Sequence, residues 1–123
     1  MANILIVDDD QDFVSAVTLV LETAGYGVEI AHTRQEGLIA FGTKKPDLVL
    51  LDVMMQDPDD GFVLAQDMKK QNPKIPIVML TSVGKVTGMS FDKDSEMVPV
   101  DDFEQKPIMP NRLLAKVKEH LSK

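Results

Sequence analysis

The sequence predicts an α/β fold: a doubly wound, five-stranded parallel sheet with helices on both faces. Two observations support this prediction. Short apolar segments rich in β-branched residues alternate along the chain with longer segments of helical periodicity. The apolar segments are continuous rather than broken by polar residues, which is typical of strands buried on both faces. Because the chain has 123 residues, we expect residues 1–123 to form a single domain.

The first strand and helix are predicted from apolar spacing. Residues 3–7 are an apolar run too short for a helix, so we interpret them as a buried strand. A helix follows from about residue 12, with Asp10 as its expected N-cap and Gly25 as its stop. Its apolar residues recur at helical spacing: Val14, Val17 and Leu21.

The second predicted strand and helix follow the same alternation. Residues 27–31 form the second predicted strand. Thr33, followed three residues later by Glu36, matches a capping box and predicts a helix that runs to about Gly42.

The remaining elements repeat the pattern. Residues 47–51 form the third predicted strand, and a helix over 62–71 follows it. Residues 75–80 and 101–105 form the fourth and fifth predicted strands. Apolar residues at helical spacing mark a last amphipathic helix: Leu113, Leu114, Val117 and Leu121.

The segment 83–100 breaks the pattern. A helix belongs there, between the fourth and fifth strands, but the segment holds two glycines, several polar residues and Pro99. Its apolar residues form no sustained stripe. We therefore expect an atypical or shortened fourth helix.

Composition and net charge argue against several classes of protein. The first ten residues have no basic leader and no apolar stretch reaches the roughly 20 residues that cross a bilayer. The chain has no cysteine, which excludes disulfides and thiolate metal sites and suits a reducing compartment. Thirteen basic against twenty acidic residues give a net charge of −7, which repels nucleic acid phosphates. We expect a cytoplasmic protein that binds neither membranes nor nucleic acid.

Polar side chains with metal-binding and phosphate-binding chemistry follow the predicted strands. Asp8 and Asp9 follow the first strand, Asp52 the third, Thr81 the fourth and Lys106 the fifth. In a parallel sheet the carboxyl ends of the strands share one edge, where ligands bind. Clustered carboxylates favour a hard divalent cation such as Mg²⁺, and a carboxylate beside it can attack a phosphoryl group.

The motifs at these strand ends, IVDDD, LLDVMM, MLTS and KP, resemble those of response regulator receiver domains over the whole chain. The resemblance implies the flavodoxin-like strand order 2-1-3-4-5. It implies that Mg²⁺ is held by Asp8, Asp9, Asp52 and the backbone carbonyl of Met54. It also implies that Asp52 is the phosphoacceptor.

The resemblance also implies roles for the other motif positions. Thr81 matches the switch hydroxyl, Lys106 the phosphate-contacting lysine and Phe103 the switch aromatic. The partner implied is a sensor histidine kinase or a histidine phosphotransfer protein. Because no output domain follows in this sequence, we expect a stand-alone receiver that signals by binding an unknown downstream protein.

Three features depart from the family pattern. Gln56 stands where the family usually has proline, Pro58 comes two residues later, and the 52–61 loop is one residue longer than expected. The stretch 81–106 is also long, and Phe103 replaces the more common tyrosine. The first two departures leave the phosphorylation chemistry intact and concern how the signal leaves the domain. The third means that the aromatic side chain can change rotamer but cannot make the hydrogen bond of a tyrosine hydroxyl.

Two positions bear on dephosphorylation. Met54 and Val83 are placed by the resemblance on either side of the phosphoryl group, two residues after Asp52 and Thr81. Both are apolar and offer no group that orients a water. We therefore predict slow self-dephosphorylation.

Three other interpretations remain open from the residues. A phosphorylation-independent interaction module would have the same fold but no need of Mg²⁺. A haloacid-dehalogenase-like phosphatase would use the DxD spacing of Asp8 and Asp10, and would turn over small phosphate esters repeatedly. A flavodoxin-like FMN carrier needs a Gly/Ser/Thr-rich loop after the first strand, where this chain has acids.

Several conspicuous side chains are expected to have no role in the site. His32 and His120 lack metal-ligand spacing, and His120 suits a helix C-terminus. The basic residues of the last helix are expected to form a solvated face: Arg112, Lys116 and Lys118.

Overall fold

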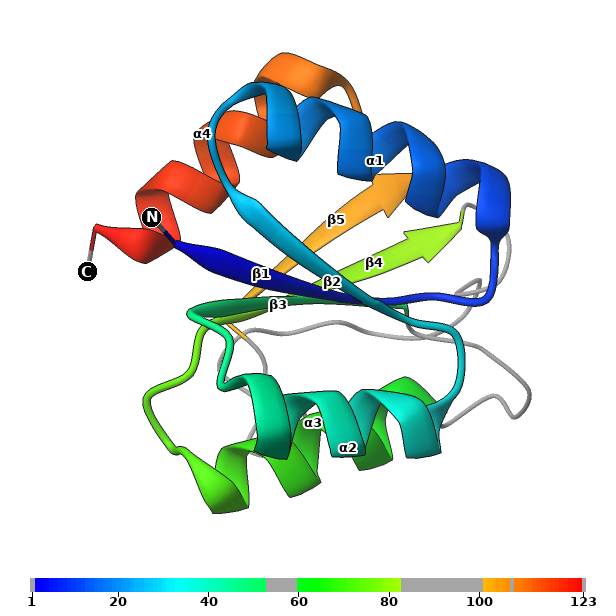
Figure 1. Cartoon of the computed structure of the whole chain (residues 1–123), viewed down its shortest axis with the longest axis vertical. Helices are drawn as coiled ribbons and strands as arrows, with labels where there is room; N and C mark the ends of the chain where they lie inside the picture. Colours follow the sequence, from blue (N-terminus) through cyan, green and yellow to red (C-terminus); the bar gives the residue numbers. More distant parts are fainter. Residues whose placement is uncertain (1, 53–59, 83–100, 107, 123) are drawn as a thin grey trace.

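The computed structural model describes residues 2–52, 60–82, 101–106 and 108–122. The elements follow one another as β1 (Asn3–Val7), α1 (Gln11–Thr23), β2 (Gly27–Ala31), α2 (Arg34–Lys44), β3 (Leu48–Asp52), α3 (Asp60–Gln71), β4 (Ile77–Ser82), β5 (Asp102–Lys106) and α4 (Pro110–Leu121) (Figure 1).

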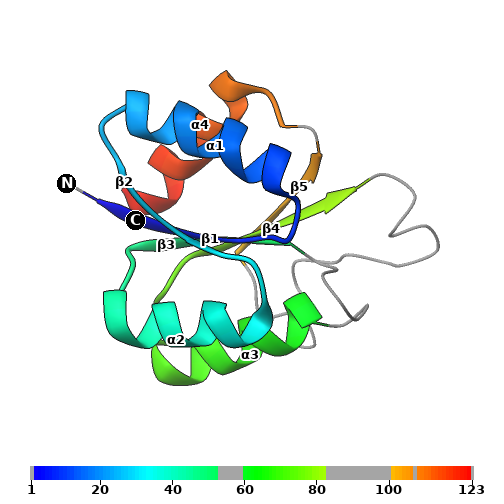
Figure 2. The same ribbon diagram turned by 45° about the vertical axis from the view of Figure 1, so that its right-hand side comes forward.

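The five strands form one sheet in the order β2-β1-β3-β4-β5, and every neighbouring pair is parallel. Helices α1 and α4 cover one face of the sheet, and α2 and α3 cover the other (Figures 1 and 2). The order reverses between β1 and β3, because the chain first winds outward to β2 and then returns past β1. In such sheets the carboxyl ends of the strands beside the reversal form the ligand-binding edge.

The core lies in two layers, one on each face of the sheet. Alternate residues of β1 divide between them: Leu5 and Val7 pack toward α2 and α3, and Ile4 and Ile6 pack toward α1 and α4. All four side chains are fully buried. Burial on both faces explains why the strands are continuous apolar runs in the sequence.

Helix ends follow the predicted caps. Asp10 accepts a hydrogen bond from the backbone N–H of Phe13 at 3.1 Å and begins α1. The Thr33 hydroxyl accepts from the N–H of Glu36 at 3.1 Å and begins α2. Gly25, with φ of +97°, follows α1 in the left-handed region that glycine adopts without strain.

Some boundaries differ from the prediction. Strand β4 begins at Ile77 rather than residue 75, since the N–H of Ile75 is engaged by Asn72 O in a turn and Pro76 has no N–H. The strand also ends at Ser82, two residues later than predicted, so Thr81 lies inside it rather than after it. Helix α2 runs two residues beyond Gly42, and α3 begins two residues before the predicted start.

The atypical fourth helix was predicted for 83–100, which lies outside the described residues. The same holds for Met54, Gln56, Pro58 and Pro107. Within the described part of the chain, no helix is both long and apolar enough to cross a membrane.

Candidate functional site

Asp8 directly follows the carboxyl end of β1, where two hydrogen bonds hold it. Its N–H donates to Ala31 O at 3.0 Å, which extends the pairing of β1 with β2 by one residue. Its side-chain Oδ1 accepts from the N–H of Asp10 at 2.9 Å, so the same turn that caps α1 also orients this carboxylate. Asp8 is fully buried, whereas Asp9 beside it is exposed.

Asp52 ends β3 on the adjacent strand. The register pairs Val7 with Leu51 and Asp52 with Leu80, so Asp8 and Asp52 both lie one residue beyond the paired positions of β1 and β3. Asp52 is only 2% exposed. Burial of a carboxylate at this edge is costly unless its charge is compensated.

The three carboxylates form a cluster. One oxygen from each of Asp8, Asp9 and Asp52 lies within 4.8 Å of the other two. Like charges this close repel one another, and a hard divalent cation with oxygen ligands relieves the repulsion. The residues therefore fit Mg²⁺: every donor is a carboxylate oxygen, and the exposed Asp9 leaves one side of the cluster open to solvent.

The backbone of Thr81 and Lys106 lies near the same edge of the sheet. Thr81 directly follows Leu80, the partner of Asp52, and is itself paired with Gln105 of β5. Lys106 ends β5 opposite Ser82. Phe103 lies further back in β5, opposite Met79.

His32 supports the site from outside. Its ring Nδ1 lies 3.2 Å from the backbone oxygen of Asp8, and its backbone N–H donates to Glu36 Oε1 at 3.4 Å. Through its ring and its backbone N–H, His32 therefore links the turn that carries the carboxylates to the start of α2.

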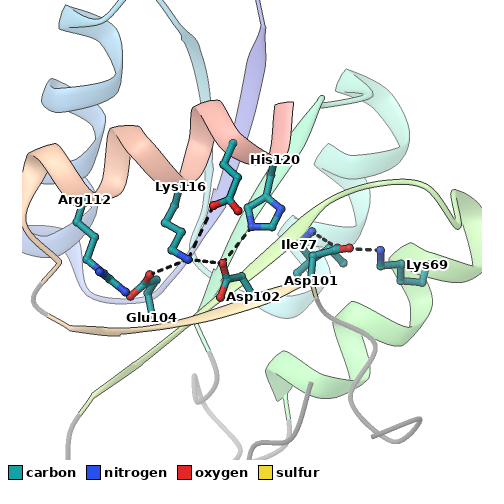
Figure 3. A network of polar contacts seen from close by, with 9 residues as sticks. Lys69, Ile77, Asp101, Asp102, Glu104, Arg112, Lys116 and His120 are labelled. Carbon is teal, nitrogen blue, oxygen red and sulfur yellow. Dashed lines mark hydrogen bonds and ion pairs between the residues drawn. The ribbon is translucent and has the colours of Figure 1, made fainter. Parts of the chain in front are cut away.

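A second charged group was missed by the sequence interpretation. Figure 3 shows the β5–α4 network, in which two acids of β5 meet three bases of α4: Asp102, Glu104, Arg112, Lys116 and His120. Lys116 Nζ lies 2.8 Å from Asp102 Oδ2 and 3.6 Å from Glu104 Oε1. Arg112 Nε lies 2.9 Å from Glu104 Oε2, and His120 Nε2 lies 3.1 Å from Asp102 Oδ2.

The network corrects the expectation of a solvated basic face on the last helix. The correction concerns Lys116, which is only 22% exposed; Arg112 and Lys118 are exposed as expected, although Arg112 is ion-paired with Glu104. The hydrogen bond to the Asp102 carboxylate raises the pKa of Lys116, and the one to Glu104 raises the pKa of Arg112. A signal was present in the sequence: acids two apart on a strand, and bases four apart on a helix.

The fold and the acidic cluster define a doubly wound α/β protein with a candidate divalent-cation site at the carboxyl edge of its sheet. Residues 4–118 match the response regulator receiver domain. The chain belongs to this family.

Curated relatives agree with the family. The chain is 36% identical to the alkaline phosphatase synthesis transcriptional regulatory protein PhoP of Bacillus subtilis over 116 residues, which cover 94% of this chain and 46% of PhoP. It is 35% identical to the probable transcriptional regulator ycf27 of Porphyra purpurea over 122 residues, which cover 96% of this chain and 46% of the relative. The chain thus spans about half the length of these relatives.

Solved structures agree as well. A CheY-like receiver domain protein from Methanospirillum hungatei JF-1 superposes with a TM-score of 0.84 at 33% identity, covering 99% of this chain and 94% of that one. The receiver domain of NtrX from Brucella abortus gives a TM-score of 0.83 at 29% identity and covers 98% of both chains. Receiver domains are signalling modules that bind Mg²⁺ and take phosphate from histidine kinases.

Proposed function

We propose that this chain accepts a phosphoryl group on Asp52 in a Mg²⁺-dependent reaction. The observation that carries the proposal is the cluster of Asp8, Asp9 and Asp52, in which the proposed acceptor is buried at a strand end beside two further carboxylates. Mg²⁺, when bound, would neutralise these carboxylates and take phosphoryl oxygens. Asp8, Asp9, Asp52 and the Met54 carbonyl are the proposed ligands.

The chain's own part in the reaction is nucleophilic. An oxygen of Asp52 attacks the phosphorus of a phosphohistidine, the new O–P bond forms, and the N–P bond to the donor imidazole breaks. Lys106 is proposed to contact the phosphoryl oxygens by charge, and Thr81 by a hydrogen bond from its hydroxyl. The backbone positions of Thr81 and Lys106 near the same edge support these roles.

The proposed result of phosphorylation is a change in the protein surface that a downstream partner binds. Once Thr81 contacts the phosphoryl group, Phe103 repacks, and the surface around residues 83–112 changes between two states. The partners are a sensor histidine kinase or histidine phosphotransfer protein, and an unknown downstream protein. We further propose a cytoplasmic location, a single domain over 1–123, and a receiver that catalyses its own phosphorylation and dephosphorylation.

The test is intact mass after incubation with Mg²⁺ and acetyl phosphate. We expect a phosphoryl adduct on the wild type, lost with EDTA and absent from Asp52→Asn. A folded wild type that gains no adduct, even from a histidine kinase, would favour the phosphorylation-independent interaction module. Continuous release of phosphate from a small ester would instead favour a phosphatase.

A finer prediction concerns the lifetime of the adduct. Because Met54 and Val83 are apolar, we expect slow self-dephosphorylation. Val83→Glu and Met54→Asn each supply a group that can orient an attacking water, so each should shorten the lifetime measured by loss of the adduct mass. Unchanged lifetimes in both variants would contradict this prediction.

A further inference from the structure

His32 contacts the backbone of a proposed Mg²⁺ ligand from the neighbouring strand. It directly follows β2, which ends at Ala31, and its ring Nδ1 lies 3.2 Å from the backbone oxygen of Asp8. Because a carbonyl oxygen only accepts hydrogen bonds, Nδ1 is the donor and carries a proton. The contact therefore requires a ring N–H at this position, and it does not require a charged ring.

The backbone of His32 is itself held at the start of α2. Its N–H donates to Glu36 Oε1 at 3.4 Å, and the N–H of Glu36 donates to the Thr33 hydroxyl at 3.1 Å. Thr33 is the N-cap of α2, so these bonds belong to the capping box that begins the helix. The ring of His32 therefore reaches the turn over residues 8–10 from a backbone that the helix start holds in place.

The oxygen that His32 contacts belongs to the peptide that joins two proposed ligands. The carbonyl of Asp8 and the N–H of Asp9 lie in one plane, because the peptide bond has partial double-bond character. The turn is also held on both sides of this peptide: the Asp8 N–H donates to Ala31 O at 3.0 Å, and the Asp10 N–H donates to Asp8 Oδ1 at 2.9 Å. The bond from His32 then fixes the orientation of the peptide plane that leads into Asp9.

Asp9 depends on this plane more than the other two carboxylates do. Asp8 and Asp52 are buried, whereas Asp9 is exposed and lacks surrounding side chains that would fix its direction. One oxygen of Asp9 nevertheless lies within 4.8 Å of an oxygen of each of the other two. Because Mg²⁺ requires near-ideal octahedral geometry with oxygen ligands at about 2.0–2.1 Å, a rotated peptide that displaces Asp9 costs affinity.

We propose that His32 is a positioning residue for the Mg²⁺ site. Its ring N–H holds the Asp8 carbonyl and so keeps the Asp9 carboxylate within reach of an ion bound by Asp8 and Asp52. This inference rests on the proposed function, which places Mg²⁺ at these carboxylates. The sequence predicts no role for His32 because it lacks ligand spacing, and the role proposed here acts through a backbone oxygen rather than through a bond to the metal.

The test is a Mg²⁺ titration of the full chain without a phosphodonor, followed by the amide signals of residues 8–10 in ¹H–¹⁵N spectra. We expect His32→Leu, which removes the donor, to weaken Mg²⁺ binding by about tenfold or more. His32→Asn retains a side-chain N–H donor and should restore most of the affinity. Gln35→Leu changes an exposed residue of α2 in the same way and should bind Mg²⁺ like the wild type.

A second readout needs no variant, because it follows the ring of His32 in the wild type. When the ring is neutral, long-range ¹H–¹⁵N spectra should place its proton on Nδ1, and a proton on Nε2 instead would overturn the proposal. Equal Mg²⁺ affinity of the wild type and His32→Leu, or equal weakening in His32→Leu and His32→Asn, would overturn it as well. A wild type that binds no Mg²⁺ would overturn the proposed Mg²⁺ site together with this inference, so the two failures are distinguishable.

Discussion

Asp9 is the member of the acidic cluster that can be changed with least damage to the fold. Asp8 and Asp52 are buried, and Asp8 also accepts the N–H of Asp10, so replacing either disturbs packing as well as charge. Asp9 is exposed, and its contribution to the cluster is its carboxylate. An effect of Asp9 on metal binding is therefore separable from an effect on stability.

We predict that Asp9→Asn weakens Mg²⁺ binding by about tenfold or more, because one charged ligand is lost. The measurement is the Mg²⁺ concentration that gives half-maximal formation of the phosphoryl adduct. Asp12→Asn is the matched control, since Asp12 is an exposed aspartate in the first turn of α1 outside the cluster. Equal Mg²⁺ dependence of the two variants would remove Asp9 from the site.

At the scale of residues, the sequence predicts those site residues that can be recognised from their neighbours in the chain. Asp8, Asp9 and Asp52 were found because each directly follows or ends an apolar strand, and parallel strands end at one edge. Asp102 and Glu104 were not interpreted as partners of α4, because pairing them requires knowing which helix covers β5. That contact depends on the tertiary arrangement, not on the local pattern.

At the scale of the elements, two glycines of α2 have opposite surroundings. A Cβ at Gly37 would lie 3.0 Å from both Leu64 Cδ2 and Val7 Cγ1, so α2 packs on the sheet through this position. A Cβ at Gly42 would have Gln71 Oε1 as its nearest neighbour, at 4.0 Å. The first glycine permits close packing, and the second only lowers helix propensity.

We predict that Gly37→Ala lowers the free energy of unfolding by about 1 to 2 kcal/mol, because overpacking outweighs the gain in helix propensity. Gly42→Ala should raise it, by up to about 1 kcal/mol. Urea denaturation of both variants checks the pair. A stabilised Gly37→Ala would mean that α2 lies further from β1 than this structure has it.

The stability that the contact between β5 and α4 contributes should fall as the pH rises. The hydrogen bond to Asp102 raises the pKa of Lys116 in the folded chain. A raised pKa contributes stability that is fully present below the unfolded value of about 10.4 and is lost as the pH rises through the folded value.

The free energy of unfolding should therefore differ between the wild type and Lys116→Met by a constant amount from about pH 7 to 9, and the difference should shrink above about pH 10.4. Urea denaturation in EDTA, at several pH values, measures this difference. An undiminished difference at about pH 11 would mean that the ammonium charge contributes nothing and that Lys116 acts through its alkyl chain alone.

Most elements could be predicted because the physics that forms them is local. Strands β1 and β2 have the predicted bounds, since each is a short apolar segment that a capped helix follows. The start of β4 was predicted two residues early, because Ile75 is apolar and buried yet belongs to a turn. An apolar residue in the sequence indicates a buried position. Whether that position belongs to a strand or to the turn before it depends on its backbone hydrogen bonds.

At the scale of the whole molecule, strand order turns scattered residues into a site. Placing β3 next to β1 brings Asp52 beside Asp8, 44 positions earlier in the chain, and placing β4 next to β3 brings the backbone of Thr81 to the same edge. The order itself came from the family resemblance, because periodicity predicts that strands are parallel but not which strands are neighbours.

The most direct test of the central claim locates the phosphoryl group. Acyl phosphates are reduced by borohydride to the alcohol, so phosphorylated Asp52 would become homoserine, which peptide mapping by mass spectrometry identifies. The account predicts homoserine at position 52 alone, only after treatment with a phosphodonor and Mg²⁺. Homoserine at Asp8 or Asp9, or phosphate on a serine, threonine or histidine instead, would contradict it.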